Sequence, residues 1–451
     1  MGLLVIIVIG AISSAVVLLR PSSNSEGRDM WTFVNTRAPI YHEIIDSWDL
    51  QGEDEVTVHL VEYQALRRRM LSGFLSGTPV ADILEVERVI ASAAWRGPLD
   101  AVGFVDLTDR LEEEGLLDAL NRPSFSPWTN RGHIFGLPAD VHPVLLAYRA
   151  DVFEAAGINV DELTTWEKFF TATRGLVQDL TGDGSPDQYV LELQETEGSA
   201  AMVLLLQAGG RFFDEAGQPD LDNPVNVKTL AHLVDWASGS DKVTGDLDLF
   251  TGAGNQLRME GFVLSWIVPD WRSIRGPLYM GRLSGKMKLM PLPAWEEGGR
   301  RTSVWGGTML GFPRSTGNFE KNWDFAKRLY LSRELARVSW KEFGVVTPVK
   351  AFWDDPVFDE PIEFYSGQPT GRLFINYAED VPVRSSSPFL ELARQELANA
   401  MGSAVRQAKA DNLDGFESLL PVVQMALEKA NANVQRQVDR NIFIAERSPS
   451  E

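Results

Sequence analysis

The chain has 451 residues, of which 44% are hydrophobic, and it is too long to fold around one compact core. The sequence therefore predicts a well-packed protein of two domains. Its formal net charge of −21 disfavours partners such as nucleic acid or an anionic lipid surface, because both call for clustered Lys and Arg. The absence of Cys excludes disulfides, thiolate metal sites, a cysteine nucleophile and a thiol-linked lipid anchor.

The chain opens on an apolar segment. Leu3–Leu19 carries no charge and is longer than the ~7–15-residue apolar core of a usual signal peptide. We expect residues 1–28 to form a signal or membrane anchor with a short polar tether, which would hold the protein at the membrane on the extracytoplasmic side. Arg20 and Arg28 follow the apolar run and no basic residue precedes it, which favours the opposite orientation. A start codon upstream of Met1 would reconcile the two.

Strand-like and helix-like segments alternate from Met30 onward. Apolar runs suited to buried strands are interleaved with runs that are apolar on one helical face, at 30–34, 39–50, 56–61, 65–77 and 81–86. Strands separated by helices of this length form right-handed βαβ units and a mostly parallel sheet. Ligands of such sheets bind outside the carboxyl ends of the strands, so we expect a site in the loops that carry Arg37, Tyr63 and Glu87.

The segment Gly136–Ile158 is expected to cross between two lobes. It starts at a Gly-Pro turn, continues as the apolar strand 144–148 and ends in a helix closed by Gly157. Asp140 and His142 stand just before the strand, and we expect both side chains to face a cleft. The alternatives are a structural role for the histidine and a turn-capping role for the aspartate.

Helical patterns dominate the rest of the chain. Apolar residues recur at three- and four-residue spacing in segments that predict helices at 164–180, 200–210, 226–239, 322–343, 388–408 and 416–440. Short strand-like pieces with aromatic or glycine residues fall at 262–268, 288–293 and 305–313. No internal repeat is present.

One loop has the spacing of a calcium site. The acids and hydroxyl that match it are Asp179, Thr181, Asp183 and Asp187. The twelfth position is Val190, where such loops place a bidentate Glu. Ca²⁺ is the one cofactor that the sequence suggests, and the alternative is a loop closed by local hydrogen bonds of its Asp side chains.

Four stretches carry a resemblance to a known family. They are GLPADVHPVLLAYRADVFEAAGI followed by TTWEKF, then LLLQAGGRFFDEAGQPDLDNP, LRMEGFVLSWIVPDW and WGGTMLGFPRSTGNFEKNWDFAKRL. In this order they resemble the extracellular solute-binding proteins of ABC importers, in family 1, which includes maltose- and oligosaccharide-binding proteins. The resemblance extends from about Met30 to Arg440.

The resemblance implies the fold and its division. We expect an α/β protein with the two-lobe periplasmic-binding-protein fold of type II. Each lobe would hold a mixed, mostly parallel sheet flanked by helices, with the ligand cleft at the hinge. The expected lobes are discontinuous, with 29–140 plus 313–350 in lobe 1 and 141–312 plus 351–445 in lobe 2.

The resemblance also extends the candidate site. Sugars need flat apolar faces and forked hydrogen-bonding groups, which Trp and charged side chains supply. Trp266 and Trp305 fall where family members place cleft residues, although a tryptophan is also a common core residue. Adjacent glycines permit close approach of a ligand and hinge motion. The full expected lining is Arg37, Tyr63, Glu87, Asp140, His142, Glu195, Trp266, Trp271, Trp305, Gly306 and Gly307.

No motif indicates catalysis. HExxH, GxSxG and GxxxxGK[ST] are all absent from the sequence. The resemblance implies a binding protein that captures a sugar or oligosaccharide by hinge closure and delivers it to the membrane permease of an ABC transporter. The alternatives are a membrane-tethered sensor of the same fold, which presents its ligand to a signalling receptor, and a carbohydrate-active enzyme.

Overall fold

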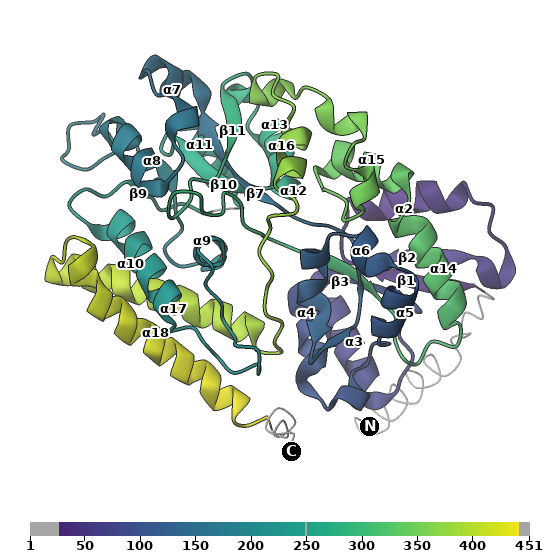
Figure 1. Cartoon of the computed structure of the whole chain (residues 1–451). Helices are drawn as coiled ribbons and strands as arrows, with labels where there is room; N and C mark the ends of the chain where they lie inside the picture. Colours follow the sequence, from purple (N-terminus) through teal and green to yellow (C-terminus); the bar gives the residue numbers. More distant parts are fainter. Residues whose placement is uncertain (1–26, 249, 442–451) are drawn as a thin grey trace, which may run out of the picture.

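The chain forms two α/β lobes (Figure 1). The computed structural model describes residues 27–248 and 250–441. The expected anchor and tether at 1–28 therefore fall almost wholly outside the described residues. Within the described ranges, no helix combines the length and the hydropathy needed to cross a bilayer.

The first lobe is built on a five-stranded sheet with the order β2-β1-β3-β12-β6. Its strands are β1 (Arg28–Thr32), β2 (Val56–Leu60), β3 (Ile83–Glu87), β6 (Leu137–Pro138) and β12 (Thr308–Gly311). β1 pairs in parallel with β2 and β3, as expected for βαβ units, whereas β12 runs antiparallel to β3 and β6. Because β12 belongs to this sheet, the chain re-enters lobe 1 at Thr308, ahead of the boundary expected after residue 312.

The second lobe differs from the mostly parallel sheet expected for it. Its three-stranded sheet has the order β10-β7-β11, and β7 (Val144–Arg149) is antiparallel to both β10 (Ser265–Pro269) and β11 (Met287–Pro291). Long stretches of chain separate β7 from β10 and β11, and no βαβ crossover connects them. A βαβ crossover joins parallel strands, whereas a long connection permits antiparallel pairing. Parallel pairing in this lobe is found between the short strands β8 (Leu191–Glu192) and β9 (Thr244–Gly245).

Helices surround both sheets. In the first lobe they are α2 (Arg37–Asp46), α3 (Tyr63–Ser76), α4 (Arg88–Ser92), α5 (Thr108–Glu113), α6 (Leu116–Ala119), α14 (Phe319–Tyr330) and α15 (Arg333–Phe343). In the second they are α7 (Ala150–Ala155), α8 (Trp166–Thr173), α9 (Ser199–Gln207), α10 (Pro224–Ser238), α11 (Gly252–Glu260), α12 (Asp270–Ser273), α13 (Arg275–Tyr279), α16 (Thr370–Asn376), α17 (Leu390–Asp411) and α18 (Phe416–Val438). The antiparallel strands β4 (Thr129–Asn130) and β5 (His133–Ile134) form a separate two-stranded sheet.

Capping residues explain where the predicted helices end. The single helix expected at 322–343 is two helices, because the Ser332 hydroxyl accepts the amide of Leu335 and starts α15 anew. The helix expected at 164–180 begins as predicted at the Thr165 cap, but its α-helical part ends at Thr173. The two C-terminal helices are confirmed, and α17 and α18 pack against each other and against α10.

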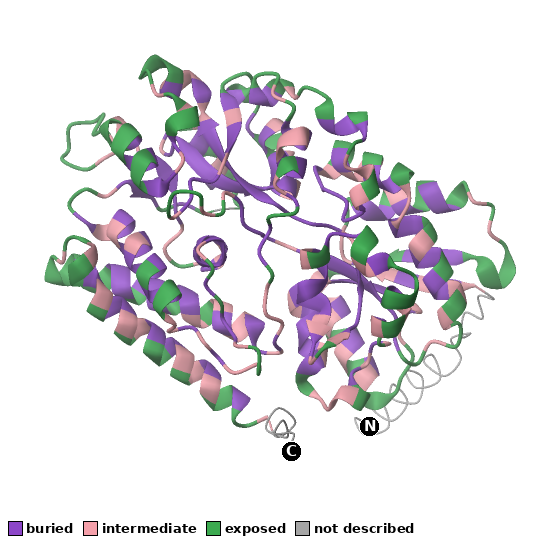
Figure 2. Cartoon of the chain, in the orientation of Figure 1, coloured by how far each residue is buried: buried purple, intermediate pink, exposed green. Residues whose placement is uncertain are grey.

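The centre of the second lobe is α9. All of its residues after Ser199 are buried, as Figure 2 shows for this helix. An α-helix that is apolar on every side must lie inside a protein, and α10 and α17 cover it. This buried helix carries Ser199 toward the space between the lobes.

The lobes meet at three neighbouring segments. Residues 139–144 and 303–308 run antiparallel and exchange backbone hydrogen bonds, including Ala139 N–H to the Thr308 carbonyl (2.9 Å). Residues 345–349 lie beside them, with the Val141 amide donating to the Val346 carbonyl (3.1 Å). The two expected crossings therefore lie side by side, and the segment 345–349 lies beside them. This arrangement is typical of a hinge.

Candidate functional site

A cavity of about 710 Å³ lies between the lobes. On the first lobe it is lined by the residues that follow β1, β2 and β3, where sheets of this kind bind ligands. On the second lobe it is lined by residues within 271–279, by Glu197 and Ser199, and by Glu391 and Arg394 of α17. The hinge segments, through His142 and 305–308, form part of the same lining.

Most of the predicted site residues are gathered at this cavity. Those that line it are Arg37, Tyr63, Glu87, His142, Trp271, Trp305, Gly306 and Gly307. Asp140 lies directly behind the lining, 3.0 Å from the His142 ring. The residues predicted from the strand ends and those predicted from the crossing segment therefore lie at the same cavity.

Two predicted residues lie elsewhere. Trp266 is 4% exposed within β10 and stands against Arg258, away from the interlobe cavity. Successive residues of a strand point to opposite faces of the sheet. The sequence around Trp266 therefore does not determine which face its indole occupies. Glu195 pairs with Lys409 (3.1 Å) and Lys242 instead of lining the cavity.

Sequence reasoning missed several charged residues of the lining. They are Arg67, Arg88, Glu197, Arg275, Glu391 and Arg394. Arg88 directly follows Glu87 at a strand end, so its position after the strand could have identified it. Glu197 is two residues from Glu195 in the same loop, so it could have been predicted together with Glu195. The positions on α3, α13 and α17 depend on how distant helices pack, which periodicity does not reveal.

Glu87 and Tyr63 form one wall of the cavity. Glu87 caps α4 by accepting the amide of Val89 (2.7 Å), and it also accepts the Tyr63 hydroxyl (3.0 Å). Burial and the neighbouring Glu87 carboxylate raise the pKa of Tyr63 well above its ordinary value. The phenol is therefore a fixed hydrogen-bond donor to Glu87.

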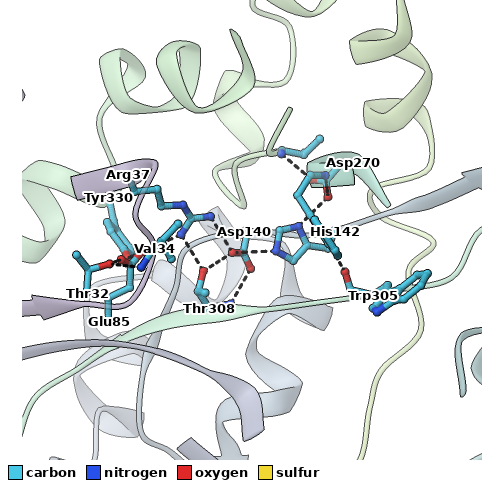
Figure 3. Close-up of polar contacts among 12 residues, drawn as sticks. Thr32, Val34, Arg37, Glu85, Asp140, His142, Asp270, Trp305, Thr308 and Tyr330 are labelled. Carbon is cyan, nitrogen blue, oxygen red and sulfur yellow. Dashed lines mark hydrogen bonds and ion pairs between the residues drawn. The ribbon is translucent and has the colours of Figure 1, made fainter. Parts of the chain in front are cut away.

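A buried chain of charges runs through the hinge (Figure 3). Glu85 and Asp140 both accept from the Arg37 guanidinium, at 2.8 and 3.2 Å. The imidazole of His142 lies between Asp140 (3.0 Å) and Asp270 (2.7 Å), and Asp270 also accepts the Val346 amide (2.8 Å). The chain of contacts thus connects β3, the first crossing, the start of α12 and the segment 345–349.

His142 is held as a cation by this chain. Burial by itself lowers the pKa of His142, but the carboxylates of Asp140 and Asp270 raise it, to about 9. Burial raises the pKa of Asp140, but His142 and Arg37 outweigh it and hold that pKa well below the ordinary range. The His142 backbone has φ 62°, a left-handed conformation that is uncommon for residues other than glycine and that the surrounding contacts hold in place.

The raised pKa of His142 predicts a loss of stability at alkaline pH. A group whose folded pKa exceeds its unfolded value of 6.5 stabilises fully below pH 6.5, and the stabilisation is lost as pH rises through about 9. The shift corresponds to about 3 kcal/mol in the free energy of unfolding. Urea unfolding from about pH 6.5 to about 9.5 measures it. A wild-type profile that is flat in this window, or one unchanged in the His142→Asn variant, would contradict the assignment.

Aromatic rings and glycines form the floor beside the hinge. The Trp271 indole donates to the Trp305 carbonyl (2.8 Å), and the two rings pack edge to face with centroids 6.3 Å apart. Gly306 has φ 119°, and a Cβ there would come within 2.6 Å of the His142 ring. A glycine is therefore required at this position for the hinge and the tryptophans to approach so closely.

A second, larger cavity of about 1330 Å³ opens elsewhere between the lobes. It is lined by the segment 122–134, the loop 211–217 and the linker 383–388. No predicted site residue lines it, and it does not lie at the carboxyl ends of β1, β2 and β3. The smaller cavity, which adjoins both the strand ends and the hinge, is therefore the candidate ligand site.

The calcium-like loop is closed by its own backbone. Asp179 accepts the amides of Gly182 and Gly184, and Asp187 accepts those of Leu180 and Thr181 together with the Thr181 hydroxyl. The side chain of Asp183 accepts the amide of Ser185 (2.8 Å). Over residues 27–248 and 250–441, no group of three or more His or acidic side chains is placed to hold a metal. Calcium binding at this loop stays a prediction.

Comparison with known proteins agrees with this architecture. The model of the bacterial extracellular solute-binding protein family matches residues 48–330. An arabinooligosaccharide-binding protein of Halalkalibacterium halodurans is 25% identical over 394 residues, which cover 84% of each chain. A protein of the same description from Bacillus subtilis is 27% identical over 323 residues, which cover 70% of this chain and 71% of the relative.

A solved structure is similar to the whole described fold. The sugar-binding protein MalE of Xanthomonas citri superposes with a TM-score of 0.71 at 15% identity, over 92% of this chain and 99% of that one. This likeness confirms the predicted two-lobe periplasmic-binding-protein fold of type II. The two lobes, the hinge and the interlobe cavity agree with the family match. Because that match covers more than half of the sequence, the chain belongs to the bacterial extracellular solute-binding proteins.

Proposed function

We propose that this protein captures an oligosaccharide in the 710 Å³ interlobe cavity and delivers it to the permease of an ABC importer. The observation that carries the proposal is the composition of that cavity. Aromatic rings of Trp271 and Trp305 lie beside carboxylates and guanidiniums from both lobes. Saccharides need this combination, because their C–H faces stack on rings while their hydroxyls take forked hydrogen bonds.

The size of the cavity fits such a ligand. Binding pockets for small molecules usually measure about 300–1,000 Å³ and bury most of the ligand. The two relatives described above are named for binding arabinooligosaccharides, which supports a pentose or hexose oligomer as the ligand class. The lining comes from both lobes, so a ligand that contacts both would favour the closed hinge.

The family is extracellular, so the chain acts outside the cytoplasm. We propose further that the apolar segment Leu3–Leu19 tethers it to the membrane beside its permease. A tether would raise the effective concentration of loaded protein at the transporter.

Calorimetry on the purified protein tests the proposed function. We expect one saccharide per chain, with a dissociation constant in the micromolar range or tighter, from a panel of arabino-, xylo-, gluco- and galacto-oligosaccharides and their acidic derivatives. Native mass spectrometry of the freshly purified protein provides an independent check, because a retained saccharide appears as a mass increment. Absence of binding across the whole panel would refute the proposal.

A further inference from the structure

We propose that the saccharide held in the interlobe cavity is acidic and carries a carboxylate, as uronic acids do. This inference deepens the proposed function, on which it rests, by naming the substrate class. It comes from the balance of charges that line the cavity. The protein as a whole is acidic, with a formal net charge of −21, yet guanidiniums from both lobes face the ligand space.

The lining carboxylates are largely engaged by the protein itself. Glu391 accepts from the Arg394 guanidinium at 2.7 and 3.0 Å. Glu197 accepts from Arg394 (2.8 Å) and from the hydroxyl of Ser199 (2.7 Å). Glu87 accepts the Tyr63 hydroxyl and a backbone amide, as described above. The fourth, Glu342, is exposed on α15.

Two of the lining arginines have no carboxylate partner among residues 27–248 and 250–441. Arg67 on α3 has a buried Nε with no hydrogen-bond acceptor and forms no ion pair there. Arg275 on α13, in the opposite lobe, lies over the Trp271 ring at 5.8 Å. A guanidinium on an indole face is well placed to bind the carboxylate of a sugar ring that stacks nearby.

Arg88 adds a third cationic group at the base of the same cavity. The residue is 9% exposed, and its Nε lacks a hydrogen-bond acceptor, although Glu87 lies 3.3 Å away as an ion-pair partner. A buried donor without an acceptor is costly, and an anion in this cavity would supply one to Arg88.

The cavity favours an anion that belongs to a sugar over a free inorganic ion. A volume of about 710 Å³ far exceeds what a phosphate or sulfate fills. Trp271 and Trp305 add apolar faces that such ions cannot use. A carboxylate also matches the planar fork of a guanidinium with two parallel hydrogen bonds.

Matched neutral and acidic ligands test this inference by calorimetry. The probes are trigalacturonate and its fully methyl-esterified form, which differ in charge at the carboxyl groups. We expect the acid to bind at least about tenfold more tightly, since a charge-assisted hydrogen bond outweighs a neutral one. The preference should shrink as NaCl rises from about 50 to about 500 mM, because part of the site is open to solvent.

Arg67→Gln should remove most of that preference, while Arg68→Gln, an exposed neighbour on the same helix, should keep it. Thermal melts of both variants establish that they are folded. Equal binding of the acid and its ester, with no effect of salt, would overturn the inference and leave the proposed function standing. If inorganic phosphate binds and no saccharide of either panel does, the proposed function fails with it.

Discussion

Replacing Asp140 with Ala is expected to lower the free energy of unfolding by about 3–5 kcal/mol, the usual cost of removing one partner from a buried charge network. Asp140 accepts from Arg37 (3.2 Å), from His142 (3.0 Å) and from the amide and hydroxyl of Thr308. Without this carboxylate the two buried cations Arg37 and His142 lose the partner that they share. Urea unfolding at pH 7 measures the loss.

Asp118→Ala is the matched control for that substitution. Its carboxylate forms an exposed ion pair with Arg122 at 3.5 Å and is 92% exposed. Pairs of this kind contribute at most about 1 kcal/mol, so this variant should unfold almost as the wild type does. If Asp140→Ala behaved like the control, the charge chain would not hold the hinge together.

The Trp271→Ala variant is expected to bind its saccharide at least about 30-fold more weakly, a loss of about 2 kcal/mol. The indole lines the cavity, lies under Arg275 and packs against Trp305. Truncation removes the flat face on which a sugar ring would stack and leaves the guanidinium without its support. Calorimetry with the best ligand of the panel measures the change.

Trp353→Ala provides the comparison for Trp271. Trp353 is also partly buried, and its indole also donates to a backbone carbonyl, that of Thr347, at the same 2.8 Å. It does not line the interlobe cavity, so its removal should affect stability and leave affinity within about twofold of the wild type. Equal losses of affinity in the two variants would show that Trp271 acts through folding and not through contact with the ligand.

Much of the first lobe could be predicted from the sequence, because its strands and helices follow one another closely along the chain. β1, α2, β2, α3 and β3 follow one another as a regular βαβ pattern, and their hydrophobic periods distinguish strand from helix. Parallel pairing then follows from the connections. For the second lobe the same rule failed, since the antiparallel partners of β7 lie more than a hundred residues away and no local pattern sets their direction.

The site was predicted to the extent that it depends on strand ends and on the crossing segment. Tyr63, Glu87 and His142 were found in this way. Arg67 and Arg394 were missed because they reach the cavity from helix surfaces, where a charged residue resembles any solvated one in the sequence. Trp266 was misplaced because a strand position alone does not decide which face of the sheet a side chain occupies.

Hydrogen–deuterium exchange with and without the best-binding saccharide tests most directly whether both lobes close on a ligand in the 710 Å³ cavity. We predict that the ligand protects 33–37 and 87–89 of the first lobe and 271–279 of the second in the same titration, together with the hinge residues 305–308. Protection confined to one lobe, or to 122–132 and 211–217 around the larger cavity, would contradict the assignment of the site.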